Sequence, residues 1–148
     1  MELEQMYQEV ILDHYRRPHG KGLQEPFDAE VHHVNPTCGD EITLRVRLTG
    51  DLDAPVVEQV SFDGQGCSIS QASASVMHDQ VSGLALTDAF ASLDEFSSLM
   101  KSATEPIEPD EELLGDAIAF EGVAKYPARI KCALLGWHAL MHALDGKP

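Results

Sequence analysis

The stretch that decides the fold reads Glu41-Ile42-Thr43-Leu44-Arg45-Val46-Arg47-Leu48-Thr49. Apolar side chains at every second position alternate with polar or charged ones, which is typical of a strand with one face buried and the other in water. Two further strands are expected at about 28–34 and 56–62. Because residues 50–55 are rich in turn formers, we expect antiparallel neighbours.

Helices are expected on both sides of these strands. Residues 3–15 carry apolar side chains at helical spacing, together with His14, and a Pro and a Gly follow them. Later helices are predicted at about 68–77, 87–102, 111–121 and 127–144. Strands first and helices later indicate an α+β fold, a small three-stranded antiparallel sheet packed against several helices. The length of 148 residues suits one domain over 1–148.

The charge of the chain limits its partners. Twenty-five acidic residues against ten basic ones give a net charge of −15, which repels a phosphate backbone and argues against nucleic-acid binding. Acidic residues are densest in 88–121, which holds ten carboxylates and one lysine. This stretch is interpreted as an acidic helical insertion that serves solubility or steers the protein toward a basic partner.

The sequence also predicts where the protein acts. It has no apolar run of the length of a membrane span, and its N-terminus lacks the basic start of a signal peptide. We therefore expect a cytoplasmic protein without a membrane partner, whose thiols are kept reduced.

Three cysteines form the most informative pattern, and each lies at a turn or at the start of a helix. Cys38 precedes the best strand, Cys67 lies between a glycine-rich turn and a helix, and Cys132 lies near the start of the last helix. With Asp40 they supply three soft ligands and one hard one, enough for tetrahedral zinc. A reactive thiol or a buried small residue is the alternative for any one of them.

Charge and ligand type suggest what such a zinc site would do. Three thiolates and a carboxylate around Zn²⁺ leave an excess of negative charge, which Arg129 and Lys131 beside Cys132 could offset. Asp40 is the hard, exchangeable ligand of the set, so the site would open more readily than one with four cysteines. A site that opens suits transfer chemistry.

Histidines offer a weaker alternative. His32 and His33 are adjacent in a predicted strand and should point to opposite faces. His138 and His142 are one turn apart on the last helix, but the sequence offers no obvious third ligand. We interpret them as partly exposed helix residues.

Several longer motifs surround the cysteines: Asp13-His14-Tyr15 within 7–18, Asn35-Pro36-Thr37-Cys38-Gly39-Asp40, the segment 64–75 beginning Gly64-Gln65-Gly66-Cys67, and Arg129-Ile130-Lys131-Cys132 continuing to Trp137. Together they resemble the IscU/NifU-type iron–sulfur cluster assembly family over nearly the whole chain. Within the family the SufU branch is the most similar. Lys131 stands where IscU proteins carry a histidine, and the acidic stretch 88–121 resembles a SufU insertion.

The resemblance implies a zinc site made by Cys38, Asp40, Cys67 and Cys132. It implies a sulfurtransferase whose Cys38 thiolate accepts persulfide sulfur from a SufS-type cysteine desulfurase, with Arg129 stabilising the site or the thiolate. The sulfur would pass to downstream iron–sulfur assembly proteins. Two other hypotheses stay open: a scaffold that assembles a [2Fe–2S] cluster, or binds iron, on the same ligands, and a structural zinc domain acting as an adaptor.

Overall fold

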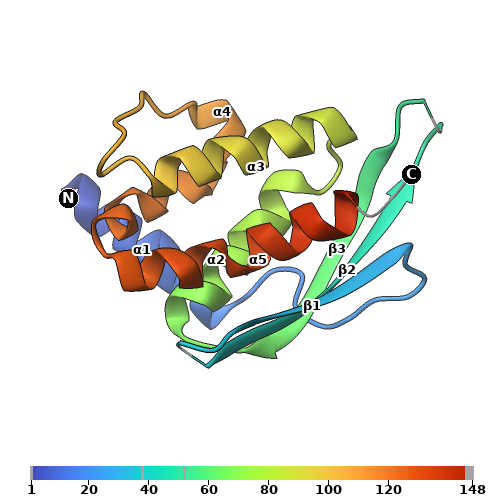
Figure 1. Cartoon of the computed structure of the whole chain (residues 1–148), viewed down its shortest axis with the longest axis horizontal. Helices are drawn as coiled ribbons and strands as arrows, with labels where there is room; N and C mark the ends of the chain where they lie inside the picture. Colours follow the sequence, from blue (N-terminus) through green and yellow to red (C-terminus); the bar gives the residue numbers. More distant parts are fainter. Residues whose placement is uncertain (1, 38, 52, 146–148) are drawn as a thin grey trace.

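Three antiparallel strands form one sheet in the order β1-β2-β3 (Figure 1). They are β1 (Ala29–Asn35), β2 (Asp40–Thr49) and β3 (Val56–Gln65). The structure is a computed structural model, and it describes residues 2–37, 39–51 and 53–145. In the central strand Ile42, Leu44 and Val46 are buried, as the alternation predicts. The third strand runs three residues further than expected, to Gln65, and this extension carries the chain toward Cys67.

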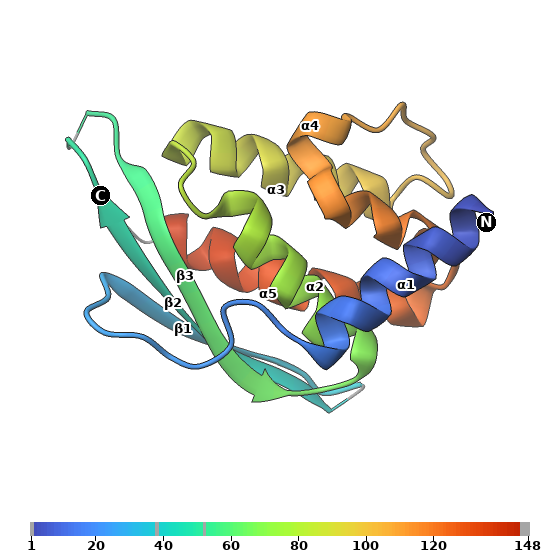
Figure 2. The same cartoon turned by 180° about the vertical axis from the view of Figure 1, so that it is seen from behind.

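Helices cover one face of the sheet, as the two opposite views agree (Figures 1 and 2). They are α1 (Leu3–Arg16), α2 (Ser68–Val81), α3 (Leu86–Met100), α4 (Glu111–Leu114), the 3₁₀ helix η1 (Gly115–Lys125) and α5 (Pro127–Asp145). Helix α5 packs on β1 and β2, whereas α2 packs on β3 and on α5. The α+β fold predicted from the sequence is confirmed.

The core between helices and sheet is built around aromatic rings. Trp137 of α5 stacks on Phe96 of α3, with ring centroids 4.3 Å apart and planes 12° from parallel. Phe120 of η1 meets the same Phe96 ring edge-on. These contacts join α3, η1 and α5 into one layer, and all three side chains are buried.

The prediction of one amphipathic helix over 111–121 is wrong. Helix α4 ends at Leu114, because Gly115 leaves the helical region with φ 51° and ψ −132°. The Gln80 side chain of α2 fills the place of a Cβ at Gly115, and its amide donates a hydrogen bond to the Glu112 carbonyl at 3.0 Å. The chain then continues as the tighter helix η1.

The apolar face predicted for α1 is only partly buried. His14 is buried, but the outer part of the face is open: Leu3 and Met6 are 59% and 48% exposed. Periodicity located the helix correctly because it reports which residues share a face. It does not report how much of that face the neighbouring helices cover.

Candidate metal centre

The register of the sheet brings Asp40 beside Cys67. Glu41 pairs with Gln65, so the first residue of β2 lies level with the segment that leaves β3. Asp40 is fully buried, and its Oδ1 accepts a hydrogen bond of 2.9 Å from the Cys67 backbone N–H. This bond fixes the start of α2, which begins after Cys67, against the start of β2.

Two glycines make this approach possible. A Cβ at Gly64 would collide with the backbone of β2 at the Glu41 carbonyl, and a Cβ at Gly66 would meet the Ser70 hydroxyl and lie 2.6 Å from Asp40 Oδ1. Without side chains at these positions the backbone passes directly over the carboxylate. The two glycines therefore let the segment after β3 converge on Asp40.

Cys132 reaches the same place from α5, and packing between helices positions it. The Ser73 hydroxyl of α2 donates a hydrogen bond of 2.6 Å to the Ala133 carbonyl and accepts one of 2.9 Å from Trp137 Nε1–H. Gly136 lies against Ala74, where a Cβ would come within 3.3 Å. Small residues on α2 therefore let α5 approach closely, and Cys132 is buried at the contact.

The result is a three-residue group that suits a metal ion. One potential ligand atom from each of Asp40, Cys67 and Cys132 lies within 4.8 Å of the others. Asp40 has no basic partner within the part of the chain that the structure describes, so a cation would relieve the cost of burying its carboxylate. Two thiols and a carboxylate are a donor set that fits zinc.

The fourth predicted ligand, Cys38, lies outside the described residues. The turn that contains it closes at the pairing of Asn35 with Asp40, and Gly39 N–H donates a hydrogen bond of 2.9 Å to the Asn35 carbonyl. Asn35 is itself buried, and no partner for its Nδ2 is found among the residues described. Cys38 as ligand and acceptor stays a prediction.

Arg129, the residue predicted to stabilise the site, contacts an aromatic ring. Its guanidinium lies over the Tyr126 ring, 5.3 Å from the centroid, and the side chain is exposed. Lys131 is exposed too and lines an open groove with Asn35 and Thr37. The stabilising role of Arg129 also stays a prediction.

Sequence reasoning missed one residue beside the thiols. Ser70, one turn into α2, has its hydroxyl 3.8 Å from Cys67 Sγ and donates a hydrogen bond to the Cys67 carbonyl. Its position three residues after Cys67, the N-cap of α2, is the sequence signal that could have predicted this contact. If its O–H turns away from the carbonyl, this hydroxyl can donate a hydrogen bond to a thiolate at Cys67 instead.

The strand histidines point to opposite faces, as expected, but one has an unexpected partner. His32 Nδ1 lies 2.9 Å from the Thr43 hydroxyl, whereas His33 Nε2 lies 3.0 Å from His142 Nδ1 on α5. Burial, and then the charge of His142, lower the pKa of His33 below its usual value. Burial also lowers the pKa of His138.

Comparison with known proteins places these features in a family. Residues 6–133 match the family described as the NifU-like N-terminal domain. The chain is 44% identical over 140 residues to the zinc-dependent sulfurtransferase SufU of Bacillus subtilis (strain 168), covering 93% of this chain and 88% of that protein.

Two further relatives carry names that concern cluster assembly. The iron–sulfur cluster assembly scaffold protein IscU of Streptococcus pyogenes serotype M1 is 41% identical over 142 residues, with 96% and 84% of the two chains covered. The crystal structure of the SufU protein of Fervidobacterium islandicum AW-1 is 36% identical and superposes with a TM-score of 0.75, covering 97% of this chain and 99% of that one. Among the described residues, no helix is both long and apolar enough to cross a membrane.

Proposed function

Because the chain belongs to the NifU-like N-terminal domain family, we propose that it acts in iron–sulfur cluster assembly as a zinc-dependent sulfurtransferase. Its reaction would take persulfide sulfur from a SufS-type cysteine desulfurase and pass it to downstream assembly proteins. The observation that carries the proposal is the group of Asp40, Cys67 and Cys132, with a fully buried carboxylate among thiols.

Cys38, Asp40, Cys67 and Cys132 would hold the zinc ion. Bound zinc would keep the cysteines deprotonated at neutral pH, the state in which sulfur is nucleophilic. The Cys38 thiolate attacks the outer sulfur of the partner's persulfide, the sulfur–sulfur bond to the partner breaks, and the partner's thiolate leaves. Cys38 then carries the transferred sulfur as its own persulfide.

The two thiols that the structure describes differ in their exposure to solvent. Cys67 is exposed and Cys132 is buried, so the side of the group that a partner can reach is the side of Cys67. A buried Cys132 suits holding an ion and does not suit meeting an external persulfide. Cys67 is therefore the next acceptor to examine if Cys38 is not the site.

A second candidate function is that of a scaffold for a [2Fe–2S] cluster, or for iron, on the same residues. It is favoured by the relatives from Streptococcus pyogenes and Thermotoga maritima, both of which are named IscU scaffold proteins. Lys131 argues against this function, because it stands where IscU proteins carry a histidine that could serve as a ligand and proton donor.

The test is alanine release by a SufS-type desulfurase, with and without the zinc-loaded chain. We expect saturable stimulation that is lost in Cys38→Ala and retained in His32→Ala, a control on the exposed face of β1. Mass spectrometry after one turnover should place the extra sulfur on Cys38. Absence of stimulation by folded, zinc-loaded protein, together with stable iron–sulfur absorbance after reconstitution, would favour the scaffold.

Two remaining parts of the proposal concern the whole chain. We propose that residues 1–148 form one domain, with the acidic stretch 88–121 as an insertion. We also propose a cytoplasmic location, because persulfide transfer needs thiols that stay reduced.

A further inference from the structure

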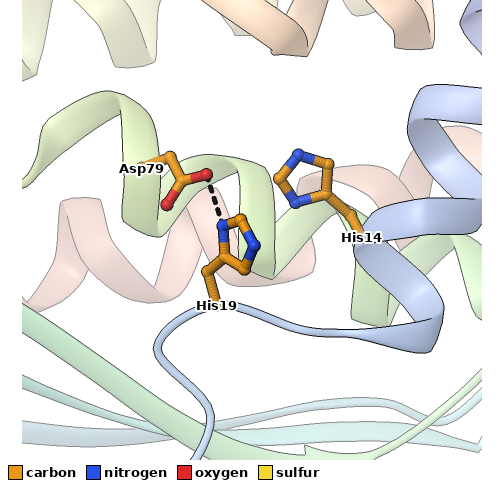
Figure 3. Close-up of side chains that lie close together, drawn as sticks. All are labelled: His14, His19 and Asp79. Carbon is orange, nitrogen blue, oxygen red and sulfur yellow. Dashed lines mark hydrogen bonds and ion pairs between the residues drawn. The ribbon is translucent and has the colours of Figure 1, made fainter.

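A second cluster of potential metal ligands lies at the junction of α1 and α2. His14 comes from α1, His19 from the loop that follows it, and Asp79 from the last turn of α2, and the three side chains point toward one another (Figure 3). One potential ligand atom from each lies within 4.8 Å of the others. An ion with bonds of about 2.1 Å holds ligand atoms up to about 4 Å apart, so a small movement would close the set.

Carboxylates orient both imidazole rings. His19 Nδ1 lies 2.6 Å from Asp79 Oδ2, and His14 Nε2 lies 3.2 Å from Asp116 Oδ2 on η1. An ionised carboxylate only accepts, so His14 Nε2 is a donor to Asp116 and His14 keeps a lone pair on Nδ1. Histidines that bind metals characteristically have such a carboxylate partner. At His19 an ion would displace the Nδ1 proton and bind Nδ1 and Asp79 together.

One buried hydroxyl holds the two histidines in place. Ser75 Oγ lies 2.7 Å from His14 Nδ1 and accepts a hydrogen bond of 2.7 Å from the His19 backbone N–H. Since Ser75 is fully buried and His14 is 5% exposed, the inner half of the cluster is rigid. An ion bound to His14 Nδ1 would replace the contact with Ser75.

The charge around the cluster suits a divalent ion that favours imidazole. Asp79 and Asp116 together match a charge of +2, and the cluster borders an open hollow of about 390 Å³ lined by His14, His19 and Asp116. Asp13, Arg16 and Arg17 line the same hollow, and the two arginines oppose a cation held by charge alone. The set therefore selects first-row transition metals over Mg²⁺ or Ca²⁺.

We propose that His14, His19 and Asp79 bind a divalent transition-metal ion, with Asp116 orienting His14, at a site separate from the cysteine group. Helix α2 separates the two sites: Cys67 precedes its first turn, and Asp79 lies about 18 Å further along the axis. The proposal goes beyond the proposed function, because it uses neither a thiol nor the sulfur acceptor.

The test counts zinc ions per chain in protein already loaded with one equivalent of Zn²⁺. Equilibrium dialysis should find a second ion in the unaltered chain. His19→Ala and Asp79→Asn, whose side chains are 52% and 43% exposed, should bind that ion at least tenfold more weakly and stay folded by circular dichroism. His142→Ala is the matched control, because it removes the contact between His142 and His33, away from the proposed site. This variant should still bind two ions.

Cobalt substitution distinguishes the two sites by their spectra. Co²⁺ bound to thiolates gives an intense near-ultraviolet charge-transfer band, whereas Co²⁺ at the histidine cluster should add only weaker visible bands. Cys67→Ser should weaken the former, because one thiolate ligand is lost, and keep the latter, so failure of the proposed function would leave this inference standing. The inference would be overturned if the unaltered protein binds no ion beyond the one that gives the thiolate band. It would also be overturned if the second ion is kept in both His19→Ala and Asp79→Asn, or is lost in His142→Ala.

Discussion

Two buried serines allow a sharp test of how α5, and with it Cys132, is held. Ser73 and Ser92 are both fully buried in helices, yet their hydroxyls differ in what they contact. Ser73 bonds the Ala133 carbonyl and the Trp137 indole N–H. The Ser92 hydroxyl has no partner among the described residues.

The two changes to alanine should therefore have different costs. Ser73→Ala leaves the buried Trp137 N–H without an acceptor, at about 1–3 kcal/mol, and removes one net hydrogen bond to Ala133, at about 1 kcal/mol. We expect a loss of about 2–4 kcal/mol in the free energy of unfolding. Ser92→Ala removes a hydroxyl that is buried without compensation, so it should be neutral or stabilising by up to about 1 kcal/mol.

Urea unfolding of the metal-free proteins measures this difference without a contribution from metal binding. Ala133 follows Cys132, so Ser73→Ala should also weaken zinc binding, whereas Ser92→Ala should not. Equal losses in the two variants, or a loss below about 1 kcal/mol in Ser73→Ala, would refute the reasoning.

Three further predictions concern the sites. Gly66→Ala should lower zinc affinity at least tenfold in competition with a chromophoric chelator, because its Cβ meets Asp40, while Gly122→Ala has open space and should match the unaltered protein. Because the pKa of His33 is lowered in the folded state, the unfolded chain binds more protons than the folded one below about pH 6.5. The free energy of unfolding should therefore fall as the pH drops from there. His33→Gln should flatten this pH dependence in urea unfolding. Zinc at a hundredfold excess over its Kd should stabilise the chain by about 2.7 kcal/mol in thermal or urea unfolding, and Cys132→Ser should lose most of that gain.

The strands and the last helix could be predicted from the sequence because their signals are local. In β2 every second side chain is apolar over eight residues, and that alternation alone specifies a strand with one buried face. The break at Gly115 could not be predicted in the same way. It depends on Gln80, 35 positions earlier, whose side chain occupies the space beside Gly115.

In the candidate sites too, the sequence does not report which distant residues come into contact. The cysteine group was predictable as a set because Cys, Asp and Gly are informative residue types at turns, but spacing says nothing of distances. The histidine cluster was missed, because His14 reads as part of an apolar helix face and Asp79 as one acid among many. Only the packing of α1 on α2 brings His14, His19 and Asp79 together.

The arrangement of the cysteine group fits the proposed sulfur transfer as well as the proposed metal binding. Asp40 and Cys132 are fixed from the protein interior, one by the sheet register and the other by the contact of α5 with α2. Cys67 stands at the surface, so the rigid half of the group lies inside and the accessible half outside. An ion can then be held firmly from one side while a thiol on the other side meets a partner. A group buried on all sides would serve structure alone, and one exposed on all sides would lose its ion to competing ligands in solution.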